Sequence, residues 1–385
     1  MAILPILARK RFEANDWQTL IITAAPTIFF SLSIFWNDFF ARKRLSRYLL
    51  IYWAVACMPL VAMGFANTYW MLLLAHLISC IGGAGYHPAS GELLKGLYPD
   101  HIRGRIYSFI WGTSMVCAAL GGLAIGWWMT KDDDAFRWFL PLFAAMQLLG
   151  VGVMVRLAIT SGIVKARVLK PSGPGGLARI FEPIAHTKEV LKADPVFARY
   201  EAAYMIYGVG WMIAYALLPI LVTDKLQLGY DEIAQSTQFA YLIALVAMLL
   251  PAGAMLDRLG AVRSTAISFA MLTLYPLGLI WASNVRELTI ASAVYGVAHA
   301  GASVGWMLGP VALAPTPAKV PQYVAIHATF VGVRGKLFQG LGVVLYSITG
   351  SFTWPLLIAA GAYLWSSRMM WTLHRRTASV AKREG

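Results

Sequence analysis

A charged residue in the middle of an apolar run is the first candidate for chemistry. Arg334 lies eleven residues into the run 323–348, which is ~17 Å along a helix. His327 lies two turns earlier on the same face, and Lys336 follows closely. A guanidinium in apolar surroundings favours an anionic partner, so the carboxylate or phosphate of a bound solute is one interpretation. Bonds to helix-end carbonyls, a break at neighbouring glycines, or outward extension of the lysine are the alternatives.

Three further apolar runs carry aromatic, histidine or small residues at helical spacing. The stripes are His76, Ser79, Gly83 and His87 in the run 70–94, Tyr295, His299, Ser303 and Trp306 in 288–312, and Tyr204, Tyr207, Trp211 and Tyr215 in 196–222. Imidazole titrates near neutral pH, so the histidines could bind a solute or carry a proton. The alternative is that these side chains serve helix packing and bonds to neighbouring backbone.

Glu201 is the one acid clearly inside an apolar run, about two turns from its end. A carboxylate there could carry a proton. We favour an ion pair with Arg199 or Lys192, because the residue lies near the expected membrane surface.

The composition indicates that these runs are membrane spans. Of 385 residues, 59% are hydrophobic and 13% charged, whereas soluble domains are about one quarter charged. Eleven runs are long enough to cross a bilayer, which predicts an all-α polytopic membrane protein. They are 19–40, 48–66, 70–94, 106–129, 137–158, 196–222, 234–256, 264–283, 288–312, 323–348 and 352–372.

The basic residues lie in alternate loops, which argues against nucleic-acid binding despite the net charge of +14. The loops on one side, with the C-terminal tail, carry 23 Lys and Arg residues, and the other side carries 7. The richer side is predicted to be cytoplasmic, so the C-terminus is inside, as in a bacterial inner-membrane protein. No spacing typical of a zinc site or disulfide framework, no nucleotide-binding motif and no cleavable signal peptide is visible, so neither a cofactor nor a metal is expected.

Residues 159–195 interrupt the pattern, with Pro171 to Gly176 followed by a charged stretch of helical spacing. We interpret them as a cytoplasmic linker with a surface helix between the halves 1–158 and 196–385. The halves look like repeats, because Leu4-Pro5-Ile6-Leu7 and Leu218-Pro219-Ile220-Leu221 occupy matching places. This predicts helices two to twelve of a 6 + 6 fold that lacks most of its first helix. A genuine 5 + 6 protein of eleven spans is the alternative.

One short loop between two spans carries the pattern Gly253-x-x-x-Asp257-Arg258-x-Gly260-x-x-Arg263. A degraded copy lies 219 residues earlier, where Asp38 and Arg42 stand without the glycines. This pattern resembles the signature between the second and third helices of each half of the major facilitator superfamily. The resemblance covers essentially the whole chain.

The resemblance implies a two-half helical bundle and secondary transport of a small solute by alternating access, with a site near mid-membrane. It places His76, Tyr207, Trp211, His299 and Trp306 on helices that line the cavity. It also implies that the signature residues form a latch between the halves in one state. We expect a monomer without enzymatic activity, coupled to protons or uncoupled, with an anionic or carboxylate-bearing solute.

Two alternatives remain open. Gly85-Tyr86-His87-Pro88-Ala89 weakly resembles an element of fosmidomycin-resistance-type exporters, which favours drug efflux. A non-transporting sensor or assembly factor on the same fold is the other.

Overall fold

The computed structural model of the chain consists of helices, and no strand occurs in the part of the chain that it describes. That part comprises residues 3–30, 36, 44–86, 93, 97–98, 100–162, 187–316 and 319–384. Three of the predicted functional residues, Asp38, Arg42 and His87, lie outside it, as does the side chain of Lys336. The chain divides into two compact units, residues 1–172 and 173–385.

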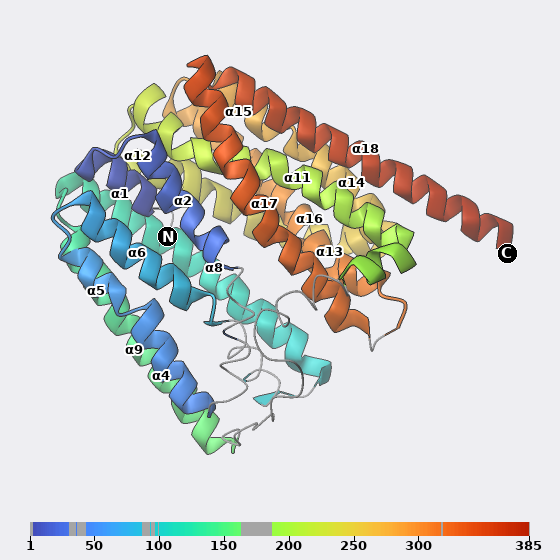
Figure 1. Ribbon diagram of the computed structural model, residues 1–385, viewed down its shortest axis with the longest axis horizontal. Helices are drawn as coiled ribbons and strands as arrows, with labels where there is room; N and C mark the ends of the chain where they lie inside the picture. Colours follow the sequence, from blue (N-terminus) through green and yellow to red (C-terminus); the bar gives the residue numbers. More distant parts are fainter. Residues whose placement is uncertain are drawn as a thin grey trace. The chain divides into compact units, whose positions relative to one another are not determined.

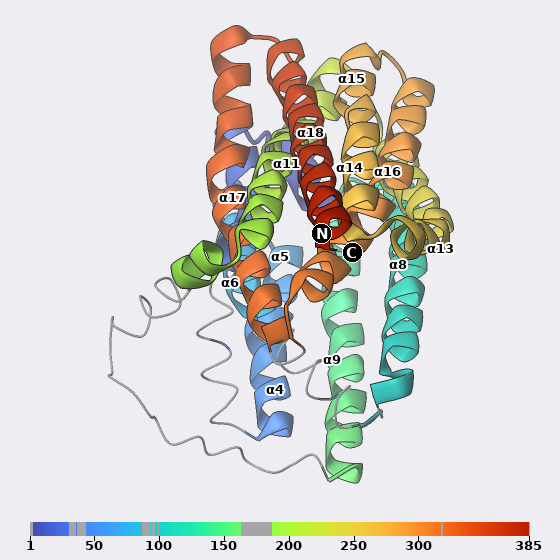
Figure 2. The ribbon, with the colours of Figure 1, turned by 90° about the vertical axis from the view of Figure 1, so that its right-hand side faces the viewer.

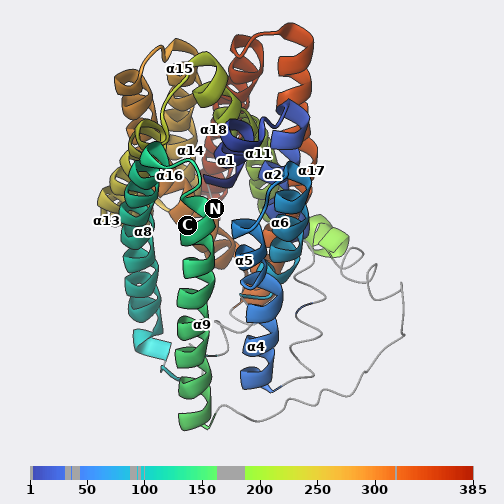
Figure 3. The ribbon, with the colours of Figure 1, turned by 90° about the vertical axis from the view of Figure 1, so that its left-hand side faces the viewer.

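The first unit begins with α1 and α2, and its two longest helices, α8 and α9, come last (Figures 1 and 3). Its helices are α1 (Ile3–Phe12), α2 (Asp16–Phe30), α4 (Leu45–Ala56), α5 (Pro59–Gly64), α6 (Tyr69–Gly83), α8 (Asp100–Lys131) and α9 (Phe136–Thr160). Pro59 has no backbone N–H and starts α5 at its first turn, so α4 and α5 form one interrupted span. This span packs against α6 and α9.

The second unit is organised around α11, which packs against both α17 and α18 (Figure 2). Its elements are α11 (Pro195–Ile220), the π-helix η1 (Leu221–Lys225), α12 (Tyr230–Ile233), the π-helix η2 (Ala234–Phe239), α13 (Ala240–Leu259), α14 (Ala261–Leu272), α15 (Leu274–Trp281), α16 (Val285–Leu313), α17 (Val320–Thr349) and α18 (Thr353–Glu384). Asp194 caps α11 by accepting hydrogen bonds from the backbone N–H groups of Val196 and Phe197. The core of this unit is aromatic, with Tyr200, Tyr204 and Phe269 fully buried.

Each of the eleven predicted spans overlaps a helix or an interrupted helix of the structure. Seven helical segments in the described residues are long and apolar enough to cross a membrane. Two boundaries differ clearly. The predicted span 70–94 corresponds to α6, which ends at Gly83 and is followed by a turn at residues 84–85. α18 was expected to end near residue 372 and continues to Glu384. Of the predicted linker helix, only residues from 187 onward lie in the described part, and they are helical up to residue 193.

The two units share an order of elements with nearly constant offset. The paired helix starts are residues 16 and 230, 45 and 261, 69 and 285, 100 and 320, and 136 and 353. The matching Leu-Pro-Ile-Leu segments are also alike, because both are helical and both prolines are buried. Their common placement agrees with the repeat read from the sequence; the missing first helix stays a prediction.

Ion pairs hold α1 in the first unit. Arg9 Nη1 lies 2.9 Å from an oxygen of Asp16, and Arg11 Nε lies 3.1 Å from Asp134 Oδ1 in the turn between α8 and α9. The hydrogen bond from Arg11 lowers the pKa of Asp134, and the charge of nearby Arg137 acts in the same direction.

The Asp134→Asn variant tests this contact. A carboxyl whose folded-state pKa is lowered stabilises the fold at neutral pH, and this contribution is lost as the pH falls through the lowered value. Because the side chain is half exposed, we expect the variant to lose under ~1 kcal/mol. Thermal unfolding in detergent from pH 7 to pH 3 measures the effect. The difference from wild type should shrink toward acid, and a difference independent of pH would contradict the assignment.

Candidate functional site

Arg334 is a buried cation with few partners. It lies in α17, its side chain is 2% exposed, and its Nη1 donates a 2.8 Å hydrogen bond to the backbone carbonyl of Tyr204 in α11. The Nε group has no hydrogen-bond partner in the described residues. α17 runs unbroken from Val320 to Thr349, so the expected alternative of a helix break at the glycines is wrong. The carbonyl bound is in the middle of α11 and not at a helix end.

Aromatic faces surround the guanidinium. Its central carbon lies 5.3 Å from the ring centroid of Tyr207 and 5.6 Å from that of Trp211. Ring faces attract cations electrostatically, and the attraction is stronger away from water. The Tyr207 ring also stacks on Phe269 of α14, with centroids 4.6 Å apart and planes at 8°. The wall beside Arg334 is therefore fixed by packing on a third helix.

Gly208 makes room for this arginine. A Cβ built on Gly208 would overlap the Cδ of Arg334, and only hydrogen fits between the two helices there. Nothing in the sequence singled out this glycine. Its position one turn after Tyr204 on α11 explains the close approach of the α17 side chain.

Glu201 and His327 form a buried pair. The Nδ1 of His327 lies 2.8 and 2.9 Å from the two carboxylate oxygens of Glu201, and the side chains are both 3% exposed. The partner expected from the sequence was Arg199 or Lys192, and the structure corrects this to a residue 126 positions away. An ionised carboxylate only accepts hydrogen bonds, so beside it Nδ1 of His327 is the donor. The Nε2 of His327 is buried without a partner in the described chain.

Aromatic rings enclose the pair. Tyr204 meets the His327 ring edge-on at 4.9 Å between centroids, Trp306 of α16 lies at 5.5 Å, and Tyr200 at 6.4 Å. The hydroxyls of Tyr200 and Tyr204 are not directed to the pair, because they donate to the carbonyls of Gly305 and Ala302. The imidazole thus lies in apolar surroundings with one carboxylate bound to it.

His299 of α16 lies beside Trp211 and so belongs to the same cluster as Arg334 and the Glu201–His327 pair. Its Nδ1 lies 2.8 Å from the hydroxyl of Tyr241 in α13, and its ring stacks on Tyr295 at 4.9 Å and 10°. The Trp211 ring lies 6.2 Å away. Six of the predicted residues are thereby brought together in the second unit: Tyr207, Trp211, His299, Trp306, His327 and Arg334.

Small residues on α16 allow this packing. A Cβ at Gly305 would meet the Thr265 hydroxyl, and one at Gly309 would overlap the hydroxyl and ring of Tyr200. These positions hold Tyr200 against α16 and so support the Glu201–His327 pair.

We expect Gly309→Ala to destabilise the second unit by ~1–3 kcal/mol, because the added methyl group forces Tyr200 out of its position. Thermal unfolding of the purified protein measures the loss. Gly361→Ala in α18 is the matched control, since its Cβ meets no atom within 4 Å. Equal unfolding temperatures for both variants would show that Tyr200 yields without cost.

His76 belongs to the first unit, and its described contacts are all with that unit. Its Nε2 lies 3.0 Å from the Ile22 carbonyl of α2, and Cys80 Sγ lies 3.5 Å from the same nitrogen. This geometry matches the packing alternative noted for the histidine stripes. A role in solute binding stays a prediction for this residue.

The signature loop joins α13 to α14. Gly253, Asp257 and Arg258 lie in the second half of α13, and Gly260 ends the helix at φ 77°, a conformation that favours glycine. Arg263, in the first turn of α14, lies with its guanidinium 5.7 Å from the Trp371 ring of α18. The connection is therefore as tight as the pattern predicts. The latch roles of Gly253, Asp257, Arg258, Gly260 and Arg263 stay predictions.

Comparisons with known proteins agree with this architecture. The sequence model of the Major Facilitator Superfamily matches residues 2–238. Multidrug resistance protein MdtH of Sodalis glossinidius (strain morsitans) is 25% identical over 135 residues, 34% of this chain and 33% of that protein. MdtH of Baumannia cicadellinicola subsp. Homalodisca coagulata is 23% identical over 129 residues, 32% and 31% of the two chains. The match thus spans about a third of the length of these curated relatives.

Solved structures share the fold over nearly the whole chain. The peptide transporter POT in complex with sulfate has a TM-score of 0.79 at 13% identity and covers 97% of this chain and 90% of its own. The nucleoside transporter NupG has a TM-score of 0.69 at 14% identity, with coverages of 97% and 94%. The human organic anion transporter MFSD10 has a TM-score of 0.58 at 14% identity, with coverages of 91% and 83%. With the family pattern matching more than half of its length, the chain belongs to the major facilitator superfamily.

Proposed function

We propose that this integral membrane protein is a secondary active transporter that moves a small anion-bearing solute by alternating access. Arg334 is the contact for the anionic group, and Glu201 with His327 carries the coupling proton. The protein works as a monomer in a bacterial inner membrane, with its C-terminus in the cytoplasm. POT is a peptide transporter, NupG a nucleoside transporter and MFSD10 an organic anion transporter, and their likeness to this chain supports the general activity.

The observation that carries the proposal is that Arg334 is buried with an incomplete set of partners. An ionised group inside a membrane protein is costly unless an opposite charge or several hydrogen bonds compensate it. Here the guanidinium has one carbonyl and two ring faces, and its Nε has no partner among the described residues. A carboxylate or phosphate of the solute would supply the missing acceptors in a bidentate geometry.

The proton site follows from the charges around it. With a neutral imidazole, Glu201 and Arg334 carry one negative and one positive charge. A proton that binds at the free Nε2 of His327 turns the ring into an imidazolium held by Glu201. The cluster then gains one positive charge, which favours an anion beside Arg334. Proton and anion therefore bind cooperatively, and linkage requires that each raises the affinity for the other.

Multidrug export is the second candidate. Both MdtH relatives are named multidrug resistance proteins, and the segment 85–89 was noted for its resemblance to a drug-exporter element. In this case the anionic group would belong to the exported compound. The same residues would bind the compound and the proton, and inward proton movement would be exchanged for outward movement of the compound.

Thermal unfolding of the purified protein against paired solutes tests the proposal. Each pair consists of a carboxylate and its methyl ester, or a phosphate and its neutral alcohol, so that only the charge differs. A bound solute stabilises the folded protein and so raises its unfolding temperature. At a concentration one hundred times the Kd, the stabilisation is ~2.7 kcal/mol. We expect the charged member of each pair to stabilise the protein more than its neutral counterpart does. Equal stabilisation by neutral members, or none by any anion, would contradict it.

A further inference from the structure

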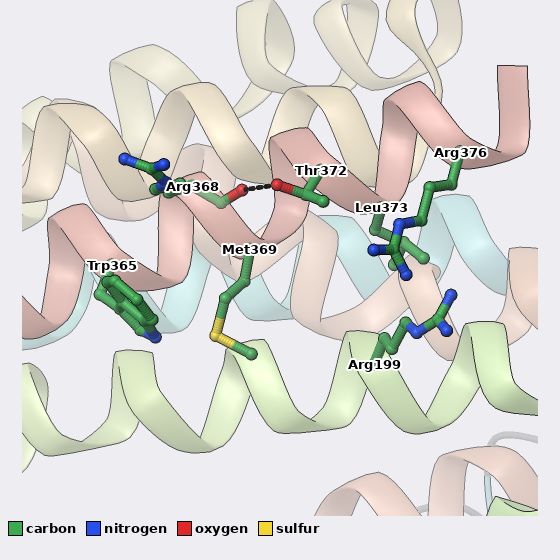
Figure 4. Close-up of a pocket in the computed structure, with 7 residues that line it drawn as sticks. All are labelled: Arg199, Trp365, Arg368, Met369, Thr372, Leu373 and Arg376. Atoms are coloured by element: carbon green, nitrogen blue, oxygen red, sulfur yellow. Dashed lines mark hydrogen bonds between the residues drawn. The ribbon is translucent and has the colours of Figure 1, made fainter. Parts of the chain in front are cut away.

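A basic pocket lies between the first turns of α11 and the C-terminal part of α18. Its volume is about 200 Å³, and it is lined by Arg199, Trp365, Arg368, Met369, Thr372, Leu373 and Arg376. Figure 4 shows the side chains of Arg199 and Arg376 side by side, with Met369 and Trp365 along the groove between the two helices. The proposed transport mechanism uses none of these residues.

The charge of the pocket is of one sign. Three guanidinium groups from two helices contribute to it, and no acidic side chain is among the described lining residues. Positive charges that gather at one place repel each other and raise the affinity for an anion. Guanidinium groups match phosphate oxygens in a bidentate geometry. The Thr372 hydroxyl is directed elsewhere, since it donates to the Arg368 carbonyl.

The rest of the pocket is apolar. Trp365 is 59% exposed, Met369 is half-buried, and Leu373 forms the buried floor. The pocket lies where the apolar part of α18 gives way to its basic end, which is the depth of the lipid headgroups. Basic pockets between membrane helices on the cytoplasmic side are typical sites for anionic headgroups. A soluble anion would gain nothing from the apolar half.

We propose that this pocket binds the phosphodiester headgroup of an anionic phospholipid from the leaflet on the C-terminal side. Arg199 and Arg376 hold the phosphate oxygens, Arg368 adds to the positive field, and an acyl chain lies along Trp365 and Met369. The lipid connects the start of α11 to α18. The inference depends on the membrane fold and not on the transported solute.

Purified full-length protein in neutral detergent gives the test. Phosphatidylglycerol, phosphatidylcholine and inorganic phosphate are titrated separately, and the unfolding temperature and the bound lipids, counted by native mass spectrometry, are recorded. We expect phosphatidylglycerol to raise the unfolding temperature and to remain bound as at least one copy. Phosphatidylcholine and phosphate should have several-fold smaller effects.

The double variant Arg199→Gln/Arg376→Gln should lose most of the response to phosphatidylglycerol. Arg286→Gln/Arg375→Gln is the matched control, because it removes the same net charge from exposed arginines that do not line the pocket. An equal response of both double variants would overturn the site. An equal response to phosphatidylcholine would show that the headgroup charge is irrelevant, and one to inorganic phosphate would identify a soluble anion instead. Each of these outcomes overturns the lipid proposal.

Discussion

We expect Arg334→Gln to abolish binding and flux of the anionic solute while the protein still folds. The variant removes the buried positive charge and keeps a side chain that can donate to the Tyr204 carbonyl. Loss of one partner of a buried charge pair costs ~2–5 kcal/mol, which is roughly a 30-fold or greater loss of affinity. Flux into proteoliposomes, with the solute found by the paired unfolding screen, measures it.

The stability of the same variant separates function from structure. A buried charge with incomplete partners does not stabilise a fold, so its neutral replacement is expected to unfold at or above the wild-type temperature. Arg286→Gln, at an exposed position in the first turn of α16, controls for the change in net charge and should transport normally. If Arg334→Gln transports the solute as wild type does, the arginine is structural and the anion site is wrong.

Arg334→Lys refines the result. Lysine keeps the charge but lacks the fork that can bind a carboxylate with two parallel hydrogen bonds. It also leaves unfilled the space over Gly208 that the arginine side chain occupies. We expect the affinity of Arg334→Lys for carboxylates and phosphates to lie between those of wild type and Arg334→Gln. The unfolding temperature should change little. Lysine that restores full affinity would mean that charge alone is recognised.

The helices could be predicted from the sequence because a bilayer leaves little choice. Backbone groups in hydrocarbon must bond within their own segment, so an apolar run of about twenty residues is a helix. The end of α18 could not be found this way. Hydropathy marks the residue at which apolar composition ends, near Arg368, whereas a helix can continue into water for as long as its local bonds persist.

The cluster was partly predictable for a related reason. Arg334 and His327 stood out because charge and imidazole are rare in apolar runs. The partner of Glu201 did not, because pairing was sought among neighbours in the chain. Arg199 is two residues away and so lies on another side of the helix. Glu201 shares its face with Tyr204 and Gly208, and this placement was the available sign that it points toward α17.

Contacts between helices account for the rest. The hydrogen bond from Arg334 to a mid-helix carbonyl and the space over Gly208 depend on the distance between α11 and α17. The hydrogen bond between His299 and Tyr241 depends on the rotation of α16 against α13. Spacing within one helix fixes which residues share a face, but it does not determine which face of a neighbouring helix they meet.

We expect Glu201→Gln to uncouple transport from the proton gradient. Glutamine can still bond to Nδ1 of His327, but it has no charge to hold an imidazolium. Tyr200, Tyr204 and Trp306 around the ring offer no replacement charge, and Arg334 opposes a second positive charge. Protonation at Nε2 is then unfavourable, so we expect accumulation driven by a pH gradient to fall more than tenfold. Exchange of labelled for unlabelled solute at equal pH should persist, because it requires no net proton movement.

The comparison of accumulation with exchange decides what the pair does. Glu287→Gln, an exposed acid in the first turn of α16, is the matched control and should keep both activities. His327→Gln should resemble Glu201→Gln, and the double variant should be no worse than either, since both act through one proton site. Loss of exchange together with accumulation would assign the pair to folding or solute binding. Uphill accumulation that survives in Glu201→Gln would place the coupling proton elsewhere, and Arg334 would then bind its anion without help from the pair.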